Sequence, residues 1–165
     1  TNISLAQSVV NFSLNFEFVP FVHSYVWASR ILLSQVIANL LINAAESIGA
    51  TGRDDGQIQI QQALIETEEG AVHQLTIADN GDGFGEEVKS KLFTRGFSTR
   101  TAKSGGNGLH WCHNTVNMMR GTLTLISEGK GKGARAVLIM PIYNISKNEN
   151  ATSSRKAINY ISRII

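Results

Sequence analysis

The sequence predicts an α/β domain. Three observations indicate this class: a long segment with helical periodicity, a pair of alternating segments typical of a β-hairpin, and a second helical segment followed by two strands. A chain of 165 residues can bury one hydrophobic core but is short for two. We therefore expect one domain over residues 1–143, followed by a tail or linker rich in Asn, Ser and Lys at residues 144–165.

The first strand and the first helix are predicted by different periodicities. Residues 14–22 alternate loosely between apolar and polar side chains and predict a strand that ends near Pro20. Residues 29–48 contain neither Gly nor Pro, and their apolar side chains recur at helical spacing, so we expect a long helix there. Gly49 and Gly52 should end this helix.

A hairpin is expected next. Residues 57–66 and 72–78 both alternate, and the turn-like sequence at 68–70 joins them. The second strand runs directly into Asp79, so this carboxylate should lie at the end of a strand.

Glycine is concentrated between residues 81 and 133, which hold eleven of the fifteen glycines. Such a density is typical of backbone that approaches a ligand closely. Within this stretch, residues 109–120 predict a helix, and residues 122–127 and 134–140 predict two strands joined by a glycine-rich turn.

Charge is distributed unevenly along the chain. Residues 54–87 carry nine acidic side chains and no Lys or Arg, whereas residues 89–135 carry nine basic side chains and one acidic one, Glu128. This asymmetry indicates a site for an anion. Nucleic acid is disfavoured because the basic residues alternate with glycines and lack aromatic stacking platforms, so we expect a small phosphorylated ligand.

The cellular compartment is inferred from cysteine usage and targeting signals. Cys112 is the single cysteine, which excludes an intramolecular disulfide, and no basic and apolar leader precedes a cleavage site. No apolar run approaches the roughly 20 residues of a membrane-spanning helix. We therefore expect a cytoplasmic domain without membrane contact, and the sequence leaves open whether a parent protein is anchored in the inner membrane.

Four polar side chains share one face of the long helix, at spacings of four, four and three residues: Gln35, Asn39, Asn43 and Glu46. One interpretation is the solvent-exposed face of an amphipathic helix. The other makes Asn43 an oxygen ligand for Mg²⁺, an ion that prefers hard oxygens shared with waters and nucleotide phosphates.

Residues 39–45, Asn-Leu-Leu-Ile-Asn-Ala-Ala, resemble the N box of histidine kinases. Residues 79–85, 92–100 and 105–109 resemble further boxes of that family and occur in the family's order. The resemblance spans about residues 16–141 and is specific because the boxes occur together. It implies the GHKL (histidine kinase-like ATPase) fold, a two-layer α/β sandwich in which helices cover one face of a mixed β-sheet, with ATP bound between helices and a mobile lid.

The resemblance implies residues for the base and for the metal. Asp79 is expected to accept a hydrogen bond from the adenine amino group, while Gly81 and Gly83 let the backbone pass under the purine. Asn43 is expected to hold Mg²⁺. The alternatives for Asp79 are an acidic glycine turn or a calcium loop, and the calcium loop lacks the distal bidentate Glu at the required spacing.

The other boxes imply the lid and the phosphate contacts. Phe93 is expected to pack at the hinge of the lid, and Arg100 and Lys103 to place positive charge on the β- and γ-phosphates. Because a helix N-terminus attracts phosphate, nucleotide binding is also expected at the start of the second helix. The residues concerned are Gly106, Asn107, Gly108 and Leu109.

Three features fit the family less directly. His110 stands where the family usually continues Gly-Leu-Gly. Residues 131–134, Gly-Lys-Gly-Ala, form either a further glycine box near the nucleotide or a plain hairpin turn. His110, Cys112 and His113 have a spacing that suggests metal ligands, but nothing else in the chain completes a structural zinc site, so we expect Cys112 to be a buried helix residue.

The function implied by the resemblance is that of the ATP-binding catalytic domain of a two-component sensor histidine kinase. GHKL hydrolases such as gyrase and the MutL proteins place a glutamate base four residues before the magnesium asparagine, where this sequence has Asn39. A neutral amide cannot deprotonate water, whereas a neutral imidazole acceptor is already nucleophilic. We therefore assign catalytic roles to Asn39, Arg100 and Lys103, and expect Mg-ATP to donate its γ-phosphate to a histidine.

The phosphoacceptor is expected outside this chain. None of the four histidines lies in a paired-helix segment next to an acidic residue, so we expect a histidine-bearing dimerisation domain upstream in the same protein and a response regulator receiver domain as the next partner. This chain alone should bind ATP but phosphorylate itself poorly. Two alternatives remain open: a degenerate ATP-binding switch module, favoured by His110, and a GHKL hydrolase or anti-sigma-type serine kinase, disfavoured by Asn39.

Overall fold

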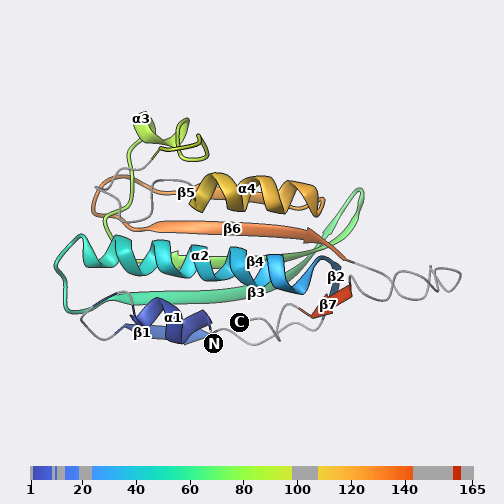
Figure 1. Ribbon diagram of the computed structural model, residues 1–165, viewed down its shortest axis with the longest axis horizontal. Helices are drawn as coiled ribbons and strands as arrows, with labels where there is room; N and C mark the ends of the chain where they lie inside the picture. The colour runs from blue at the N-terminus through green and yellow to red at the C-terminus, as the bar shows by residue number, and fades with distance from the viewer. Residues whose placement is uncertain are drawn as a thin grey trace, which may run out of the picture.

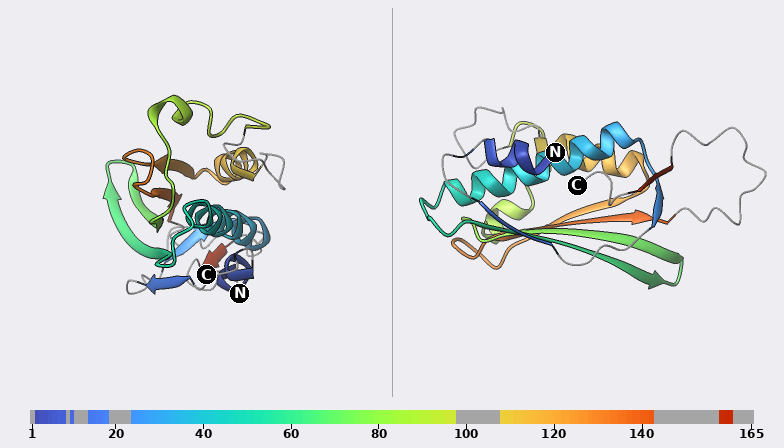
Figure 2. Two further views of the ribbon diagram at one scale, coloured as in Figure 1. Left: turned by 90° about the vertical axis from the view of Figure 1, so that its left-hand side faces the viewer. Right: turned by 90° about the horizontal axis from the view of Figure 1, so that it is seen from below.

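The structure is a computed structural model that describes residues 2–8, 10, 14–18, 24–97, 108–142 and 158–160. A mixed five-stranded sheet forms one layer, and the helices form a second layer on one of its faces (Figure 1). The right-hand view in Figure 2 shows the two long helices together on the same side of the sheet. The expected class, a two-layer α/β sandwich with a mixed sheet covered on one face, is confirmed.

The sheet combines one parallel and three antiparallel pairings. The first strand pairs in parallel with the first strand of the expected hairpin, and every other neighbouring pair is antiparallel. The strand order is β1 (Asn15–Phe18), β3 (Gln57–Thr67), β4 (Gly70–Asp79), β6 (Ala134–Pro141) and β5 (Thr122–Ile126).

The central helix α2 (Arg30–Gly49) confirms the long helix expected from periodicity. It begins because the Ser29 side chain accepts a hydrogen bond from the backbone N–H of Leu32, which satisfies one free donor of the first turn. It ends at Gly49, and Gly52 then adopts a φ of 68°, a conformation that glycine tolerates best. Nine of its side chains are buried.

By length and composition alone, α2 is apolar enough to cross a membrane, with a mean hydropathy of 1.5. Half of that stretch is nevertheless buried inside the domain, as is usual for the core helix of a globular protein. The polar stripe of α2 interrupts its apolar residues, so the sequence shows no continuous apolar run there.

The second main helix, α4 (Gly108–Met118), packs on α2 and on the sheet. Cys112 and Val116 are fully buried and Met119 is nearly so, so these residues form the face that points into the core. The residue that ends this region, Gly121, has no room for a side chain, because a Cβ there would lie 2.5 Å from the sulfur of Met140 and 2.7 Å from a carbonyl oxygen of β6.

The core lies between the helices and the covered face of the sheet. Apolar side chains alternate along each central strand, so that every second residue points toward the helices. The buried strand residues include Ile58, Ile60, Leu75, Ile77, Leu138 and Met140.

Four short elements were not expected from the sequence. They are α1 (Asn2–Ser8), which packs on α2, the helix α3 (Glu86–Lys89), and the strands β2 (Tyr25–Trp27) and β7 (Ile158–Tyr160), which pair with each other as a separate two-stranded sheet. The strand expected at 14–22 is described only as Asn15–Phe18, and residues 19–23 lie outside the described part of the chain. Because β7 belongs to the segment expected as a tail, that segment contributes a strand, and the boundary at residue 143 stays a prediction.

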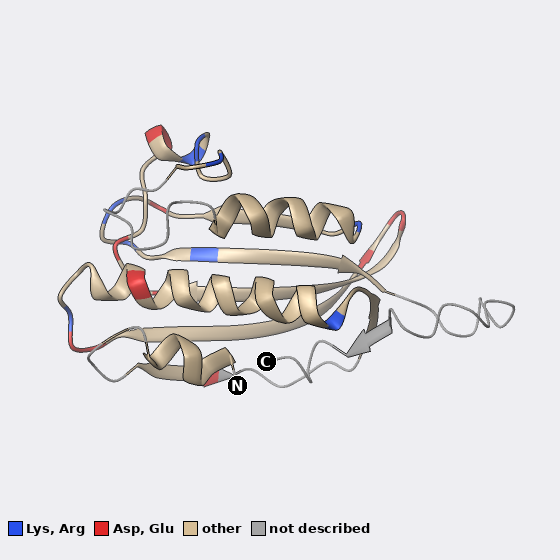
Figure 3. Ribbon diagram, in the orientation of Figure 1, with Lys and Arg blue, Asp and Glu red and all other residues tan. Residues whose placement is uncertain are grey.

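Charged residues lie at both ends of the sheet (Figure 3). Acidic side chains gather at the β3–β4 turn. At the opposite end, β4 finishes at Asp79, and Lys130 of the β5–β6 turn pairs with Asp82 in the loop that follows this strand. The short helix α3 (Glu86–Lys89) comes after this loop.

Candidate functional site

A pocket of ≈ 230 Å³ opens between α2, α4 and the ends of β4, β5 and β6. Six of the residues expected at a nucleotide site line it: Asn39, Asn43, Asp79, Gly83, Gly108 and Leu109. Gly81 and Phe93 lie immediately behind the lining and support it, as described below. Arg100, Lys103, Gly106 and Asn107 lie outside the described residues.

The polar stripe of α2 forms one side of the pocket. Asn39, Asn43 and Glu46 line it, whereas Gln35, one turn earlier, is exposed. The amide nitrogen of Asn39 donates to the backbone carbonyl of Gln35 at 3.0 Å. The oxygen of Asn39 faces the start of α4, since a Cβ on Gly108 would lie 3.5 Å from it. The stripe is therefore a pocket wall over three of its four residues and a solvent-exposed face at the fourth.

The Asp79 loop (residues 79–83) forms another side of the pocket, where β4 ends. The Asp79 carboxylate accepts a hydrogen bond from the N–H of Gly81 at 2.9 Å. The N–H of Asp82 donates to both the carbonyl and the hydroxyl oxygen of Ser47 in α2, each at 3.1 Å. These bonds fix the direction of the loop against the helix.

The two glycines of this loop are required for different reasons. Gly81 is buried against α2, and a Cβ there would lie 2.5 Å from the carbonyl carbon of Ser47. Gly83 has a φ of 64°, and a Cβ on it would meet the carbonyl oxygen of Gly133 at 2.6 Å. Gly83 therefore lines the pocket, while Gly81 packs the loop onto the helix behind it.

The β5–β6 turn also holds the Asp79 loop in place through hydrogen bonds. The N–H of Gly133 donates to the carbonyl of Gly81 at 3.0 Å, and Ser127 Oγ donates to the carbonyl of Gly133 at 2.7 Å while accepting from the N–H of Phe84. Ala134, the residue after this turn, lines the pocket. Residues 131–134 are thus a hairpin turn that also supports the site, and their contact with a nucleotide stays a prediction.

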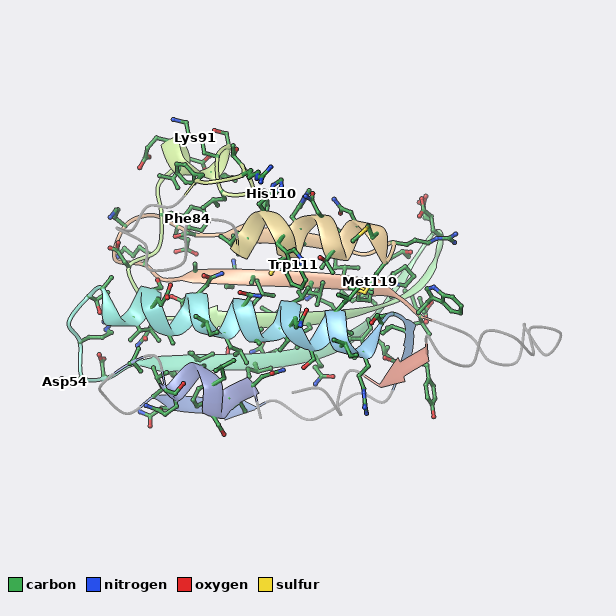
Figure 4. All side chains as sticks on the ribbon, in the orientation of Figure 1. Asp54, Phe84, Lys91, His110, Trp111 and Met119 are labelled. Atoms are coloured by element: carbon green, nitrogen blue, oxygen red, sulfur yellow. The ribbon has the colours of Figure 1, made fainter. Side chains whose placement is uncertain are left out.

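The Phe93 segment (residues 92–97) closes the pocket from the side of α3. Leu92 and Phe97 line the pocket, and Phe93 is half-buried against the hydrophobic core. Two histidines of α4 contact Phe93: His110 Nδ1 lies 2.8 Å from its carbonyl oxygen, and the His113 ring stacks on its ring with centroids 4.6 Å apart. Figure 4 shows His110 at the start of α4, next to this segment.

These contacts account for two of the residues considered as metal ligands, and the third is buried. Cys112 is fully buried, its thiol points to the carbonyl of Val36, and burial raises its pKa to about 12. The expectation of a buried Cys112 is therefore confirmed. Within the described ranges, no three His, Cys, Asp or Glu side chains gather as ligands for a metal.

Several pocket residues were not identified from the sequence. Apolar examples are Ile77, Leu92, Leu125 and Ala136. Ile77 stands two residues before Asp79 on the same strand face, so the alternation of β4 contained a signal for it. Ser47 had no signal, because its contact with Asp82 joins segments 35 residues apart.

The chain matches one protein-family model, described as Histidine kinase-, DNA gyrase B-, and HSP90-like ATPase, over residues 28–144. It is 33% identical over 117 residues to the sensor histidine kinase ZraS of Escherichia coli O157:H7, covering 71% of this chain and 23% of that protein. It is 36% identical over 115 residues to the signal transduction histidine-protein kinase AtoS of Escherichia coli K12, covering 70% of this chain and 17% of that protein. The chain thus spans less than a quarter of either relative.

Among solved structures, the chain resembles the mycobacterial sensor histidine kinase MprB with a TM-score of 0.70. The two are 20% identical, and the match covers 87% of this chain and 93% of that one. At this level of identity the likeness establishes a shared fold.

Proposed function

We propose that this chain, which belongs to the histidine kinase-, DNA gyrase B-, and HSP90-like ATPase family, binds Mg-ATP in the pocket between α2 and α4 and donates the γ-phosphate to a histidine on another domain. It is the ATP-binding catalytic domain of a sensor histidine kinase. The observation that carries the proposal is the pocket itself, which gathers a carboxylate, an apolar lining and a row of amide oxygens.

The adenine base fits the sheet end of the pocket. Ile77, Leu125 and Ala136 supply apolar surface for a planar ring, and Asp79 adds an acceptor that selects a ring carrying an amino group. The Asp79 loop is fixed by hydrogen bonds to α2 and to the β5–β6 turn, so the acceptor is oriented before a base arrives.

The phosphates fit the helix end of the pocket. Gly108 opens α4, and the N-terminus of a helix favours anions. Asn39, Asn43 and Glu46 provide oxygen donors on the facing helix, a set of the kind that Mg²⁺ accepts, with Asn43 as the proposed ligand. When bound, Mg²⁺ would neutralise charge on the β- and γ-phosphates. Arg100, Lys103, Gly106 and Asn107 are proposed to add charge and N–H donors there.

Phosphoryl transfer fits this pocket better than hydrolysis. Asn39 lies beside the start of α4, at the proposed phosphate end, and its amide cannot act as a general base toward water. A histidine acceptor needs positioning and charge neutralisation instead. We therefore propose a cytoplasmic domain whose partners are a histidine-bearing dimerisation domain and, after it, a response regulator receiver domain.

Calorimetry with a non-hydrolysable ATP analogue tests the proposed binding. We expect binding that weakens when EDTA removes Mg²⁺ and that weakens by about tenfold in Asn43→Ala, because this variant lacks the proposed oxygen ligand of the ion. Gln35→Ala is the matched control, since it also removes an amide side chain from the same helix face, outside the pocket. The proposal fails if the intact domain binds no analogue at millimolar concentration.

A degenerate switch module is the second candidate, and His110 in place of the usual glycine was its main support. The structure accommodates His110 through its bond to the Phe93 carbonyl, so this departure does not disrupt the pocket. Mixing the domain with the upstream histidine-bearing segment and labelled ATP separates the two functions. An acid-labile phosphoprotein is expected, and its absence in the presence of normal ATP binding would favour the switch module.

A further inference from the structure

The Phe93 segment has no strand pairing to fix its position. The backbone hydrogen bonds recorded for it in the described structure are local turns: Leu92 donates to Lys89, Thr94 to Lys91, and Phe97 to Thr94. Its position over the pocket must therefore be set largely by side-chain contacts, and two of these come from neighbouring turns of α4.

The hydrogen bonds of His110 define its tautomer. The carbonyl oxygen of Phe93 can only accept, so Nδ1 must carry the proton and donate across 2.8 Å. The other ring nitrogen, Nε2, then accepts from the amide nitrogen of Asn114 at 3.1 Å. A neutral imidazole thus satisfies both contacts, and Asn114, one turn along, fixes the ring plane.

His113 contacts the same residue through its ring. The two aromatic planes are inclined by 27° with centroids 4.6 Å apart, a stacked arrangement within van der Waals reach. The amide nitrogen of Asn117, one turn along α4, lies 3.3 Å from His113 Nδ1 and 3.5 Å from Nε2, so it contacts the ring without selecting one of the two nitrogens. The carbonyl and the side chain of Phe93 are therefore both held by one helix face.

We propose that His110 and His113 are positioning residues that dock the Phe93 segment on α4 and thereby set the affinity of the pocket for nucleotide. The effect on affinity rests on the proposed function. Leu92 and Phe97 line the pocket on either side of Phe93, so a displacement of Phe93 moves both of them. Leu109, which precedes His110, also lines the pocket, so the first turn of α4 contributes both to the pocket and to the contact with Phe93.

Hydrogen exchange of the nucleotide-free domain tests the docking without requiring ligand. In His110→Ala, we expect the amides of residues 92–97 to exchange about tenfold faster, while those of α2 and β4 are unchanged. His110→Asn should restore wild-type exchange, because its amide nitrogen presents an N–H donor at the δ position that Nδ1 occupies. Met118→Ala, at a position 73% exposed on the same helix, is the matched control and should change nothing.

Nucleotide affinity, measured on the same variants, tests the positioning role. His110→Ala and His113→Ala should each weaken binding of the ATP analogue by about three- to tenfold, the usual effect of one lost partly buried contact. His110→Asn and His113→Phe should stay within about twofold of wild type. Unchanged exchange in His110→Ala would overturn the docking, and faster exchange with unchanged affinity would overturn the positioning role. Absence of binding in the wild type itself would overturn the proposed function and the positioning role, while the exchange result would still decide the docking.

Discussion

Two walls of the pocket, the Asp79 loop as the first and the Phe93 segment as the second, are held by different kinds of contact. The Asp79 loop is fixed by backbone hydrogen bonds to α2 and to the β5–β6 turn, and by glycines that allow the chains to approach closely. The Phe93 segment is held by two side chains of α4. A single substitution can release the second wall, whereas the first depends on the path of the main chain. We therefore expect ligand choice to reside in the Asp79 loop and adjustment of affinity in the Phe93 segment.

The largest effect should come from the acceptor in the first wall. Asp79→Asn replaces a carboxylate with an amide that presents an N–H to the adenine amino group, so affinity for the ATP analogue should fall by at least about a hundredfold. Asp82→Asn is the matched control, because Asp82 lies in the same loop but pairs with Lys130 at the surface. Calorimetry that gives equal affinities for wild type and Asp79→Asn would remove the base-binding role from this wall.

The free energy of unfolding should depend on pH through β4, the strand that leads into the Asp79 loop. His73 lies on β4, is fully buried against Ser24, and burial lowers its pKa from 6.5 to about 4. Between these values the unfolded chain takes up a proton that the folded chain does not. The contribution of His73 is therefore fully present above pH 6.5, falls as the pH decreases, and has dropped by about 3 kcal/mol near pH 4.

Urea unfolding of wild type and His73→Asn between pH 7 and pH 4.5 measures this contribution. The asparagine keeps a polar partner for Ser24 and does not titrate, so its free energy of unfolding should fall less steeply with acid. The slope is compared, which makes a lower baseline in the variant irrelevant. If the free energies of unfolding of wild type and His73→Asn fell in parallel as the pH decreased, the titration of His73 would not contribute to acid sensitivity.

Two glycines allow the walls to be compared directly. Gly81→Ala in the first wall would place a Cβ 2.5 Å from the backbone of α2, which cannot move aside, so the free energy of unfolding should fall by about 2–3 kcal/mol. Gly96→Ala in the second wall meets nothing within 4 Å but keeps a φ of 76°, so the cost should be about 1 kcal/mol. Equal losses in thermal or urea unfolding would contradict the difference in how the walls are built.

The same contrast explains what the sequence could predict. Periodicity identified α2, the β3–β4 hairpin, α4 and the last two strands, and the family resemblance assigned Asp79 and Asn43 to one site. Periodicity did not identify β2 and β7, because a strand of three residues is too short to show a pattern. The pairing of these two strands also joins segments that are far apart in the sequence. Nor did periodicity identify the contact of His110 with Phe93, because neither residue type nor spacing signals a bond between a loop carbonyl and a helix side chain.

The smallest expected effect concerns α4 itself. Cys112 is fully buried on the face of α4 that meets α2, and its raised pKa of about 12 leaves little thiolate, so labelling by a thiol reagent at pH 8 should require opening of the helix. Removing the contact between His110 and Phe93 in His110→Ala should leave this labelling rate within about twofold of wild type. The reason is that α4 is held in place by its buried face and not by its contacts with the Phe93 segment. A labelling rate that rises together with exchange of residues 92–97 would mean that helix and segment move as one unit. The second wall would then include α4, and His110 would stabilise the helix instead of docking a segment on it.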